Sequence, residues 1–234
     1  MALKVNWCNT CGWGRNFGDQ LTTRLLTRYG IKHEWAPPTR CELIGAGSIL
    51  SKVPRDWAGA VWGTGLIRPG MHADLRHARI LALRGELTAA HVKHPRPRPT
   101  YAFGDPGILV IDLPRADVEP TSVLLVPHYV DKDMVNRYPG ERVLDITAPA
   151  EQVLGTIASA RVVITSSLHA LIAADALGVP HVLEPHPRVT GGLHKFMDYA
   201  SAFGERVIPG QERLSDRATM LVRQAQLREA LWHV

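Results

Sequence analysis

Short apolar segments of strand length alternate with helical patterns along nearly the whole chain, and this alternation restricts the fold more than any other feature. Near the C-terminal end, Arg161–Thr165 (RVVIT) has the composition of a buried strand, Leu168–Leu177 of an apolar helix, and His181–Glu184 of a further strand. A strand, a helix and a second strand in this order form a parallel βαβ unit. The sequence therefore predicts an α/β fold whose parallel sheets carry helices on both faces.

The alternation occurs in two series. The strands expected in the first series are Leu3–Cys8, Ile31–Ala36, Cys41–Gly45, Ala60–Gly63 and Ile80–Leu83, with helices at Asp19–Tyr29 and Glu86–His91. The second series adds strands at Ser122–Pro127 and Arg142–Ile146 and helices at Glu151–Ser159, Leu193–Phe203 and Ser215–Leu231. Both series have the spacing of doubly wound sheets.

Prolines separate the two series. They lie in HPRPRPT (94–100) and DLPRADVEPT (112–121), and such stretches end regular elements. We therefore expect two domains, residues 1–115 and 116–234. Each is a Rossmann-like half, and the two face each other across a cleft. Ligands of such sheets bind beyond the carboxyl ends of the strands, so the functional site is expected in that cleft.

The overall charge favours an anionic ligand. The chain has a formal net charge of +5 and a pI near 9.3, which suits phosphates, acidic glycans or nucleic acid. No apolar run approaches the ~20 residues of a membrane helix, and MALKVNWCNT does not have the pattern of a signal peptide. Three cysteines form no evident disulfide framework. These features predict a cytoplasmic protein.

The segment TSSLHALIAADALGVPHV (165–182) places polar residues where an apolar helix must begin. Ser166 or Ser167 can cap that helix by accepting hydrogen bonds from its first amides. The remaining amides and the helix dipole favour an anion. His169, in the first turn, can donate a hydrogen bond or a proton to it. The other interpretation is a simple cap with a histidine packed on the sheet.

The segment CGWGRNFGD (11–19) lies between the first strand and the first helix, where a dinucleotide-binding fingerprint occurs. Its glycines read G-x-G-x-x-x-G, one residue longer than the standard pattern, although Glu34 is placed to bind a ribose. We favour the alternative, in which Asn16, Gly18 and Asp19 shape a loop over the cleft and Asp19 caps the following helix.

The cysteines of CNTC (8–11) have the spacing of redox or zinc motifs. A zinc site needs further ligands, and a thioredoxin-type motif begins a helix, whereas this one runs into a glycine-rich loop. The pair is therefore interpreted as structural. No other cluster has metal-ligand spacing, and no metal site is predicted.

Three further residues, Arg84, His128 and Lys195, follow expected strands or begin expected helices, on the same rim as His169. Arg84 follows a strand and can bind phosphate through two N–H groups; otherwise it is a surface arginine paired with Glu86. His128 follows a strand, Asp105 lies in the turn GDPG (104–107), and Lys195 opens a helix. The coincidence of Arg84, His128, His169 and Lys195 on one rim favours a functional site over separate structural roles. For Asp105 the alternative is a turn residue only.

These motifs occur in an order that resembles one known family. The motifs are NFGD (16–19), GAGSIL (45–50), VWGTGL (61–66), RGELTA (84–89), FGDPGIL (103–109), PHYVDK (127–132), SSLHALIAADALGVP (166–180) and KFMDY (195–199). Together they resemble the polysaccharide pyruvyl transferase family, in its bacterial exopolysaccharide branch, from about Asn16 to Tyr199. This chain is shorter than typical members, and it has Ser167 where many relatives have an arginine.

The resemblance implies a fold like that of glycosyltransferases of the GT-B type and a particular reaction. Phosphoenolpyruvate is the donor, no other cofactor is needed, and a sugar or glycan receives a pyruvate ketal. Arg84 and His169 match positions that contact the donor, and Leu168 supplies an amide. Ser166, Ser167, Asn16, Asp19, Asp105, His128 and Lys195 are further candidate binding residues. We infer that His169 is the general acid; the alternative, equally open from the sequence, is that it only binds the phosphate.

Two other functions remain open from the sequence. A nucleotide-sugar glycosyltransferase can use the same scaffold, acting on a glycan or a nucleic acid. A non-catalytic module that binds an anionic glycan or nucleic acid is the second. The clustering of polar residues at strand ends, and the lack of an aromatic and basic stripe, favour an enzyme.

Overall fold

The structure is a computed structural model that describes residues 1–8, 17–94, 101–131 and 133–234. Its strands are β1 (Leu3–Asn6), β2 (His33–Trp35), β3 (Leu43–Ile44), β4 (Ala60–Trp62), β5 (Ala73–Asp74), β6 (Arg79–Leu83), β7 (Val92–Lys93), β8 (Ala102–Phe103), β9 (Thr121–Val126), β10 (Arg142–Val143), β11 (Ala160–Thr165), β12 (His181–Leu183) and β13 (Glu212–Arg213). The α-helices are α1 (Leu21–Arg28), α2 (Glu86–Ala89), α3 (Met134–Arg137), α4 (Ala150–Ala158), α5 (Leu168–Leu177), α6 (His194–Ser201) and α7 (Arg217–Leu231). Three 3-10 helices are η1 (Gly18–Gln20), η2 (Leu50–Lys52) and η3 (Pro106–Asp112).

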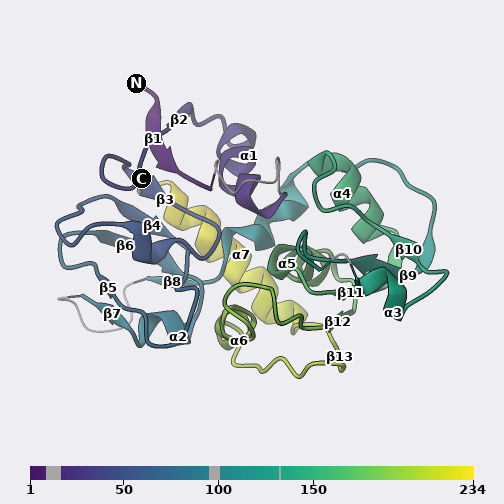
Figure 1. The fold of residues 1–234 in the computed structure, drawn as a ribbon. Helices are drawn as coiled ribbons and strands as arrows, with labels where there is room; N and C mark the ends of the chain where they lie inside the picture. Colours follow the sequence, from purple (N-terminus) through teal and green to yellow (C-terminus); the bar gives the residue numbers. More distant parts are fainter. Residues whose placement is uncertain (9–16, 95–100, 132) are drawn as a thin grey trace.

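Two main sheets lie side by side (Figure 1). The first has the strand order β2-β1-β3-β4-β6-β8, and all of its pairings are parallel. The second has the order β10-β9-β11-β12-β13 and is parallel except for β13, which runs antiparallel to β12. A small parallel pair, β5-β7, lies beside the first sheet. The predicted α/β fold with parallel sheets is confirmed.

Side chains alternate between the two faces of the first sheet, as the pleat requires. Leu43 and Trp62 enter a large core that also includes Leu124 and Leu171 of the second half. Ile44 and its neighbours on the opposite face form a smaller, separate core. The large core therefore continues from one sheet to the other, through η3, which packs against both α1 and α5.

Helix α7 connects the two halves in a way that the sequence did not indicate. It begins beside the second sheet and crosses to β4, β6 and β8 of the first (Figure 1). Trp62 is fully buried, and its Nε1 donates a hydrogen bond to the carbonyl of Leu227 at 3.0 Å. The expected boundary between residues 115 and 116 stays a prediction, because this last helix packs on the sheet of the first half.

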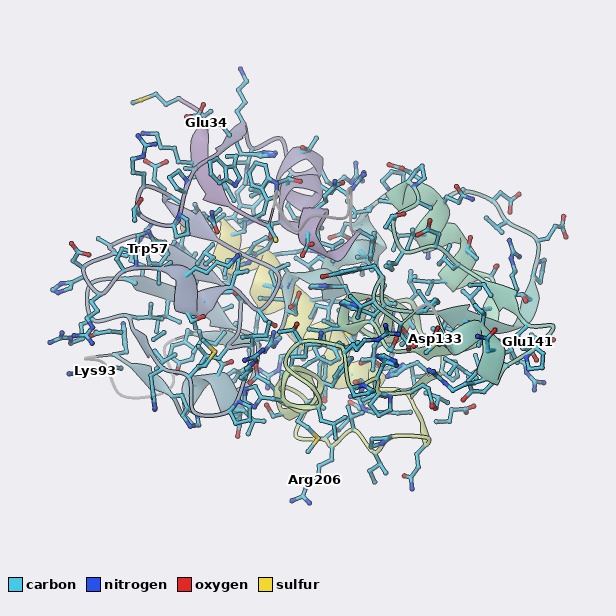
Figure 2. The ribbon with its side chains drawn as sticks, viewed as in Figure 1. Glu34, Trp57, Lys93, Asp133, Glu141 and Arg206 are labelled. Atoms are coloured by element: carbon cyan, nitrogen blue, oxygen red, sulfur yellow. The ribbon has the colours of Figure 1, made fainter. Side chains whose placement is uncertain are left out.

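The charged side chains labelled in Figure 2 lie at the rim of the molecule. Glu34, Lys93 and Arg206 are exposed and point outward. Among the described residues, no helix is long and apolar enough to cross a membrane.

Replacing Trp62 tests the contact between α7 and the first sheet. The change Trp62→Phe removes the donor to Leu227 and leaves a small cavity, so we expect a loss of about 1–3 kcal/mol of unfolding free energy. Trp232 follows α7 and is 75% exposed, and Trp232→Phe is the matched control, expected to stay within about 0.5 kcal/mol. Urea denaturation of both variants is the measurement. A Trp62→Phe variant as stable as the wild type would show that the contact between Trp62 and Leu227 is dispensable.

Candidate functional site

A pocket of about 240 Å³ lies at the carboxyl ends of strands from both sheets. In the first sheet, β2 and β3 flank β1 on opposite sides, and in the second, β10 and β11 flank β9 in the same way. At each such switch of direction the two following loops diverge and leave a crevice. The pocket is lined from both crevices by Cys8, Gly47, Ser48, Ile49, His128, Tyr129, Val130, Ser167, Leu168 and His169.

A larger hollow, of about 600 Å³, lies at the opposite, amino ends of the first sheet. It is lined there by Leu3, Gly59 and Arg79, among others, and by none of the residues predicted for the site. The smaller pocket is the better candidate because ligands of open parallel sheets bind at the carboxyl ends of the strands.

The first turn of α5 enters the pocket, but the capping expected from its two serines is wrong. Ser167 is the N-cap residue, and its side chain forms no capping hydrogen bond. Ser166 instead accepts a hydrogen bond from the amide of His128 at 2.9 Å, which ties the β9 loop to the start of the helix. The first amides of α5 therefore have no side-chain cap among the described residues and remain available to an anion.

His169 stands at the bottom of this turn, and 12% of its side chain is exposed. Its Nε2 atom lies 3.9 Å from Oδ2 of Asp105, and its Nδ1 atom lies against Gly18. A Cβ atom added to Gly18 would be 2.1 Å from Nδ1, so a glycine is required there. Burial, followed by the positive charges of Lys195 and Arg84, lowers the pKa of His169 to about 3. The ring is neutral at neutral pH.

Arg84 does follow β6 and precede α2, as expected, but its side chain is fully buried and does not line the pocket. Its Nε donates to Oδ2 of Asp198 at 2.8 Å, Nη2 donates to the carbonyl of Leu66 at 2.7 Å, and Nη1 donates to Oγ of Ser48. The alternative of a surface pair with Glu86 is wrong. The guanidinium lies behind the pocket wall formed by Ser48, and its contact with a donor stays a prediction.

Lys195, on α6, lines the pocket and is 7% exposed. No described residue forms a hydrogen bond or ion pair with its Nζ. Burial, with the nearby charge of Arg84, lowers the pKa of Lys195 to about 8, although Asp19 acts in the opposite direction. The ammonium group is thus held in the pocket at a cost in stability, which is typical of a binding or catalytic cation.

Asp19 and His128 are two further titratable residues that line the pocket. Burial raises the pKa of Asp19 to about 6, against the attraction of Lys52 and Lys195. Burial also lowers the pKa of His128 to about 4, and the charge of Lys195 adds to this effect. Asp19 was expected to cap α1, but the N-cap residue of α1 is Gln20 and no side chain caps it. The carboxyl group lies in the pocket instead.

Asp105 is fully buried beneath His169, at the start of η3. Its Oδ1 accepts the amide hydrogen of Gly107 at 2.9 Å, and its Oδ2 has no hydrogen-bond partner among the described residues. Burial raises the pKa of Asp105 to about 6. The expected turn at GDPG is therefore the cap of a 3-10 helix.

Some residues of the predicted motifs fall outside the described part of the chain. Asn16 lies outside it, as do most of the glycine-rich loop and Cys11 of the CNTC motif. Cys8 is disulfide-bonded, a bond that the cysteine pattern of the sequence does not indicate, and Cys41 is a free, buried thiol. Among the described residues no group of three or more His, Cys, Asp or Glu side chains is arranged to hold a metal.

Sequence reasoning did not find Ser48, Lys52, Tyr129 and Arg188, which also line the pocket. Ser48 follows β3, and Tyr129 follows β9, so their positions after strands were the available signal. The pocket thus combines the cations Lys52, Arg188 and Lys195 with one carboxylate, Asp19.

The fold and the pocket define an α/β protein with a pocket lined by cations at the carboxyl ends of strands from both sheets, and comparison with known proteins gives the family. The model of the polysaccharide pyruvyl transferase family matches residues 43–185, more than half of the chain. The chain therefore belongs to the polysaccharide pyruvyl transferase family. The matched region contains Arg84, Asp105, His128 and His169 but ends before Lys195.

Two relatives extend this finding. The chain is 27% identical over 228 residues to the succinoglycan biosynthesis protein ExoV of Rhizobium meliloti (strain 1021), covering 90% of this chain and 69% of ExoV. It is 28% identical over 172 residues to the uncharacterised protein L143 of Acanthamoeba polyphaga mimivirus. That alignment covers 68% of this chain but only 58% of the viral protein.

Replacing Lys195 with an uncharged residue should stabilise the protein. The lowered pKa of Lys195 means that the folded state binds fewer protons than the unfolded state between about pH 8 and 10.5, so stability rises with pH in that window. Lys195→Met removes a cost of about 3 kcal/mol at most. We expect a melting temperature several degrees above wild type at pH 7 and a smaller difference at pH 10. Lys93→Met, at an exposed lysine, should change neither value. A lower melting temperature for Lys195→Met would contradict the assignment.

Replacing Arg84, whose charge lies near Lys195, should instead destabilise the protein. Asp198 is fully buried, so Arg84→Ala leaves a buried carboxylate without its partner, and we expect a loss of about 3–5 kcal/mol. The exposed pair of Arg76 and Asp74 supplies the control, because Arg76→Ala should leave the melting temperature unchanged. Calorimetry of both variants decides between a structural and a purely ligand-binding role for Arg84.

Proposed function

We propose that this chain transfers a pyruvyl group from phosphoenolpyruvate to hydroxyl groups of a sugar, in a polysaccharide or its precursor, and forms a pyruvate ketal. The observation that carries the proposal is the pocket itself, in which the uncapped first turn of α5 and the buried Lys195 face the same small space. Family membership supports the reaction class. The name of ExoV associates that relative with polysaccharide synthesis.

The charge and size of the pocket suit phosphoenolpyruvate. This donor carries up to three negative charges on a small frame, and helix amides and cations bind such anions in a desolvated site. A volume of about 240 Å³ is below the roughly 300–1,000 Å³ of pockets that hold larger ligands. It favours phosphoenolpyruvate over a nucleotide sugar. The two parallel sheets on either side support a GT-B-like arrangement of two Rossmann-like halves.

The reaction needs an acid and a base. Protonation of the methylene carbon makes C2 electrophilic; a sugar hydroxyl then adds to C2 and loses its proton. Inorganic phosphate leaves and takes up one proton. A second hydroxyl of the sugar adds to the same carbon and closes the ketal, and its proton replaces the one given to the methylene carbon. The phosphate would lie at the amides of Leu168 and His169, where the dipole of α5 stabilises the charge that develops as it leaves.

Lys195 fits the role of acid better than His169. With a pKa of about 8 the amine carries a proton at neutral pH, whereas His169, with a pKa near 3, carries no second proton. A bound trianion raises the pKa values of both groups, and Lys195 then remains protonated throughout. We therefore assign proton donation to Lys195 and contact with the phosphate and the hydroxyl to His169. This replaces the expectation that His169 is the acid.

Thermal stabilisation by ligands tests the donor. Phosphoenolpyruvate should raise the melting temperature at concentrations at which NAD and UDP- or GDP-sugars have no effect, because a ligand bound to the folded state alone adds RT ln(1 + [L]/Kd). Inorganic phosphate should stabilise more weakly. His169→Ala should keep the fold and abolish turnover, measured as phosphate release in the presence of sugar acceptors. Stabilisation by a nucleotide sugar instead would indicate a glycosyltransferase.

A further inference from the structure

Two buried polar atoms face each other behind the pocket without any hydrogen bond. They are Oδ2 of Asp105 and Nε2 of His169, 3.9 Å apart, and neither has a partner among the described residues. Leaving such atoms unpaired costs free energy, so the arrangement needs an explanation. The distance is about 1 Å longer than an N–H···O hydrogen bond. Contacts of this kind often shorten only when the substrate binds.

The backbone fixes the direction in which Asp105 points. Its Oδ1 accepts the amide of Gly107 at 2.9 Å and is therefore occupied. A Cβ atom on Gly107 would be 3.2 Å from Oδ1 and 2.9 Å from Cγ2 of Ile172, so the turn, the carboxyl group and α5 are tightly packed. Oδ2 faces the imidazole of His169. The amide of Gly47 lies near enough to the carboxyl group to help lower its pKa, but it forms no hydrogen bond of normal geometry with Oδ2.

The backbone also fixes the imidazole of His169. Nδ1 lies against the Cα atom of Gly18, where an added Cβ would be 2.1 Å away. The ring is partly exposed, yet Nε2 is buried, so the accessible part of the ring lies away from Asp105. The two ring nitrogens therefore meet different surroundings. One faces a carboxyl group and the other lies on the side of Gly18, next to the pocket wall at Asp19.

We propose that Asp105 is a positioning residue that holds neutral His169 in the tautomer with its proton on Nε2. Oδ2 accepts that proton in a hydrogen bond, and the lone pair of Nδ1 is left on the pocket side. The carboxyl group is ionised at neutral pH, since burial raises its pKa only to about 6. A carboxylate is an acceptor without a proton of its own, so it selects the N–H form of the nitrogen it faces.

For the proposed reaction, on which this step rests, the tautomer makes His169 a base. The O–H bond of the sugar hydroxyl breaks, its electron pair forms the bond to C2, and its proton moves to Nδ1. The resulting imidazolium lies beside the carboxylate of Asp105, which stabilises its charge. Lys195 supplies the other proton, to the methylene carbon. Acid and base are then two different side chains of the same pocket.

The tautomer can be measured without any substrate. Long-range ¹H–¹⁵N NMR of protein labelled at histidine distinguishes a protonated from an unprotonated ring nitrogen, and the signals of His169 are those missing from His169→Gln. We expect Nε2–H in the wild type. In Asp105→Asn the amide oxygen can keep the bond from Gly107 while the NH₂ group faces Nε2. The tautomer should then change to Nδ1–H. Asp112→Asn is the control; Asp112, at the other end of η3, binds Tyr29 and Arg228 and should leave the tautomer unchanged.

Kinetics supply the second readout. Asp105→Asn should lower kcat by about 10²–10⁴-fold and leave stabilisation by phosphoenolpyruvate within about twofold of wild type. Nδ1–H in the wild type, or no change in Asp105→Asn, would overturn the proposal. If Asp105→Asn does not fold, the wild-type spectrum alone still tests the proposal, because it shows which ring nitrogen of His169 carries the proton. An Nε2–H tautomer in a protein without pyruvyl transfer would refute the proposed function and keep the role of Asp105.

Discussion

The buried ion pair between Arg84 and Asp198 holds together the parts of the structure from which the pocket is built. Arg84 comes from the end of β6 and Asp198 from the middle of α6, and both are fully buried. The remaining oxygen contacts of Asp198 are with the amide and hydroxyl of Thr88 on α2. Gly85 permits this approach, because a Cβ there would lie 1.7 Å from the carbonyl of Asp198. One pair thus joins the first sheet to the helix that carries Lys195.

This pair also contributes to the electrostatics of the site. Burial is the main cause of the lowered pKa values of Lys195 and His169, and the positive charge of Arg84 adds to it. The same charge acts to lower the pKa of Asp105, while Asp198 acts more weakly to raise it. Charges of both signs are therefore held close together away from water, where they interact strongly. Such an arrangement stores unfavourable energy that an anionic ligand can relieve. This accounts for a stable scaffold with a destabilised centre.

The sequence allowed most of the scaffold to be predicted, because strands and helices alternate with clear periods. Leu168–Leu177 was predicted with the bounds that α5 has, and β1, β4, β6 and α7 were found within a few residues. The structure brings His128, His169, Lys195 and Asp19 to one pocket, because strand ends and helix starts meet at one edge of parallel sheets. The position of Arg84 after β6 was predicted, but its burial was not. Its buried side chain is paired with Asp198, which lies 114 residues away in the sequence.

Other features depended on contacts that local patterns do not contain. The capping by Ser166 was wrong because its hydroxyl binds a strand loop 38 residues away. The 3-10 helix η3 was expected to be only a turn, since a single aspartate before Pro106 does not show how many residues follow in helical form. Gly18 and Gly107 allow Asp105 and His169 to face each other, because neither position has room for a side chain. The sequence does not show this crowding, since it comes from residues that are distant along the chain.

The position of α7 has a consequence for how the protein is made. Residues of the first sheet leave the ribosome early, but the surface of that sheet around Trp62 is covered by Leu227, near the end of the chain. Until α7 is synthesised, a large aromatic side chain and its neighbours remain open to water and to other chains. This face of the first sheet is therefore open to aggregation during translation. A chaperone that binds apolar surfaces would act on it until residues of the last helix arrive.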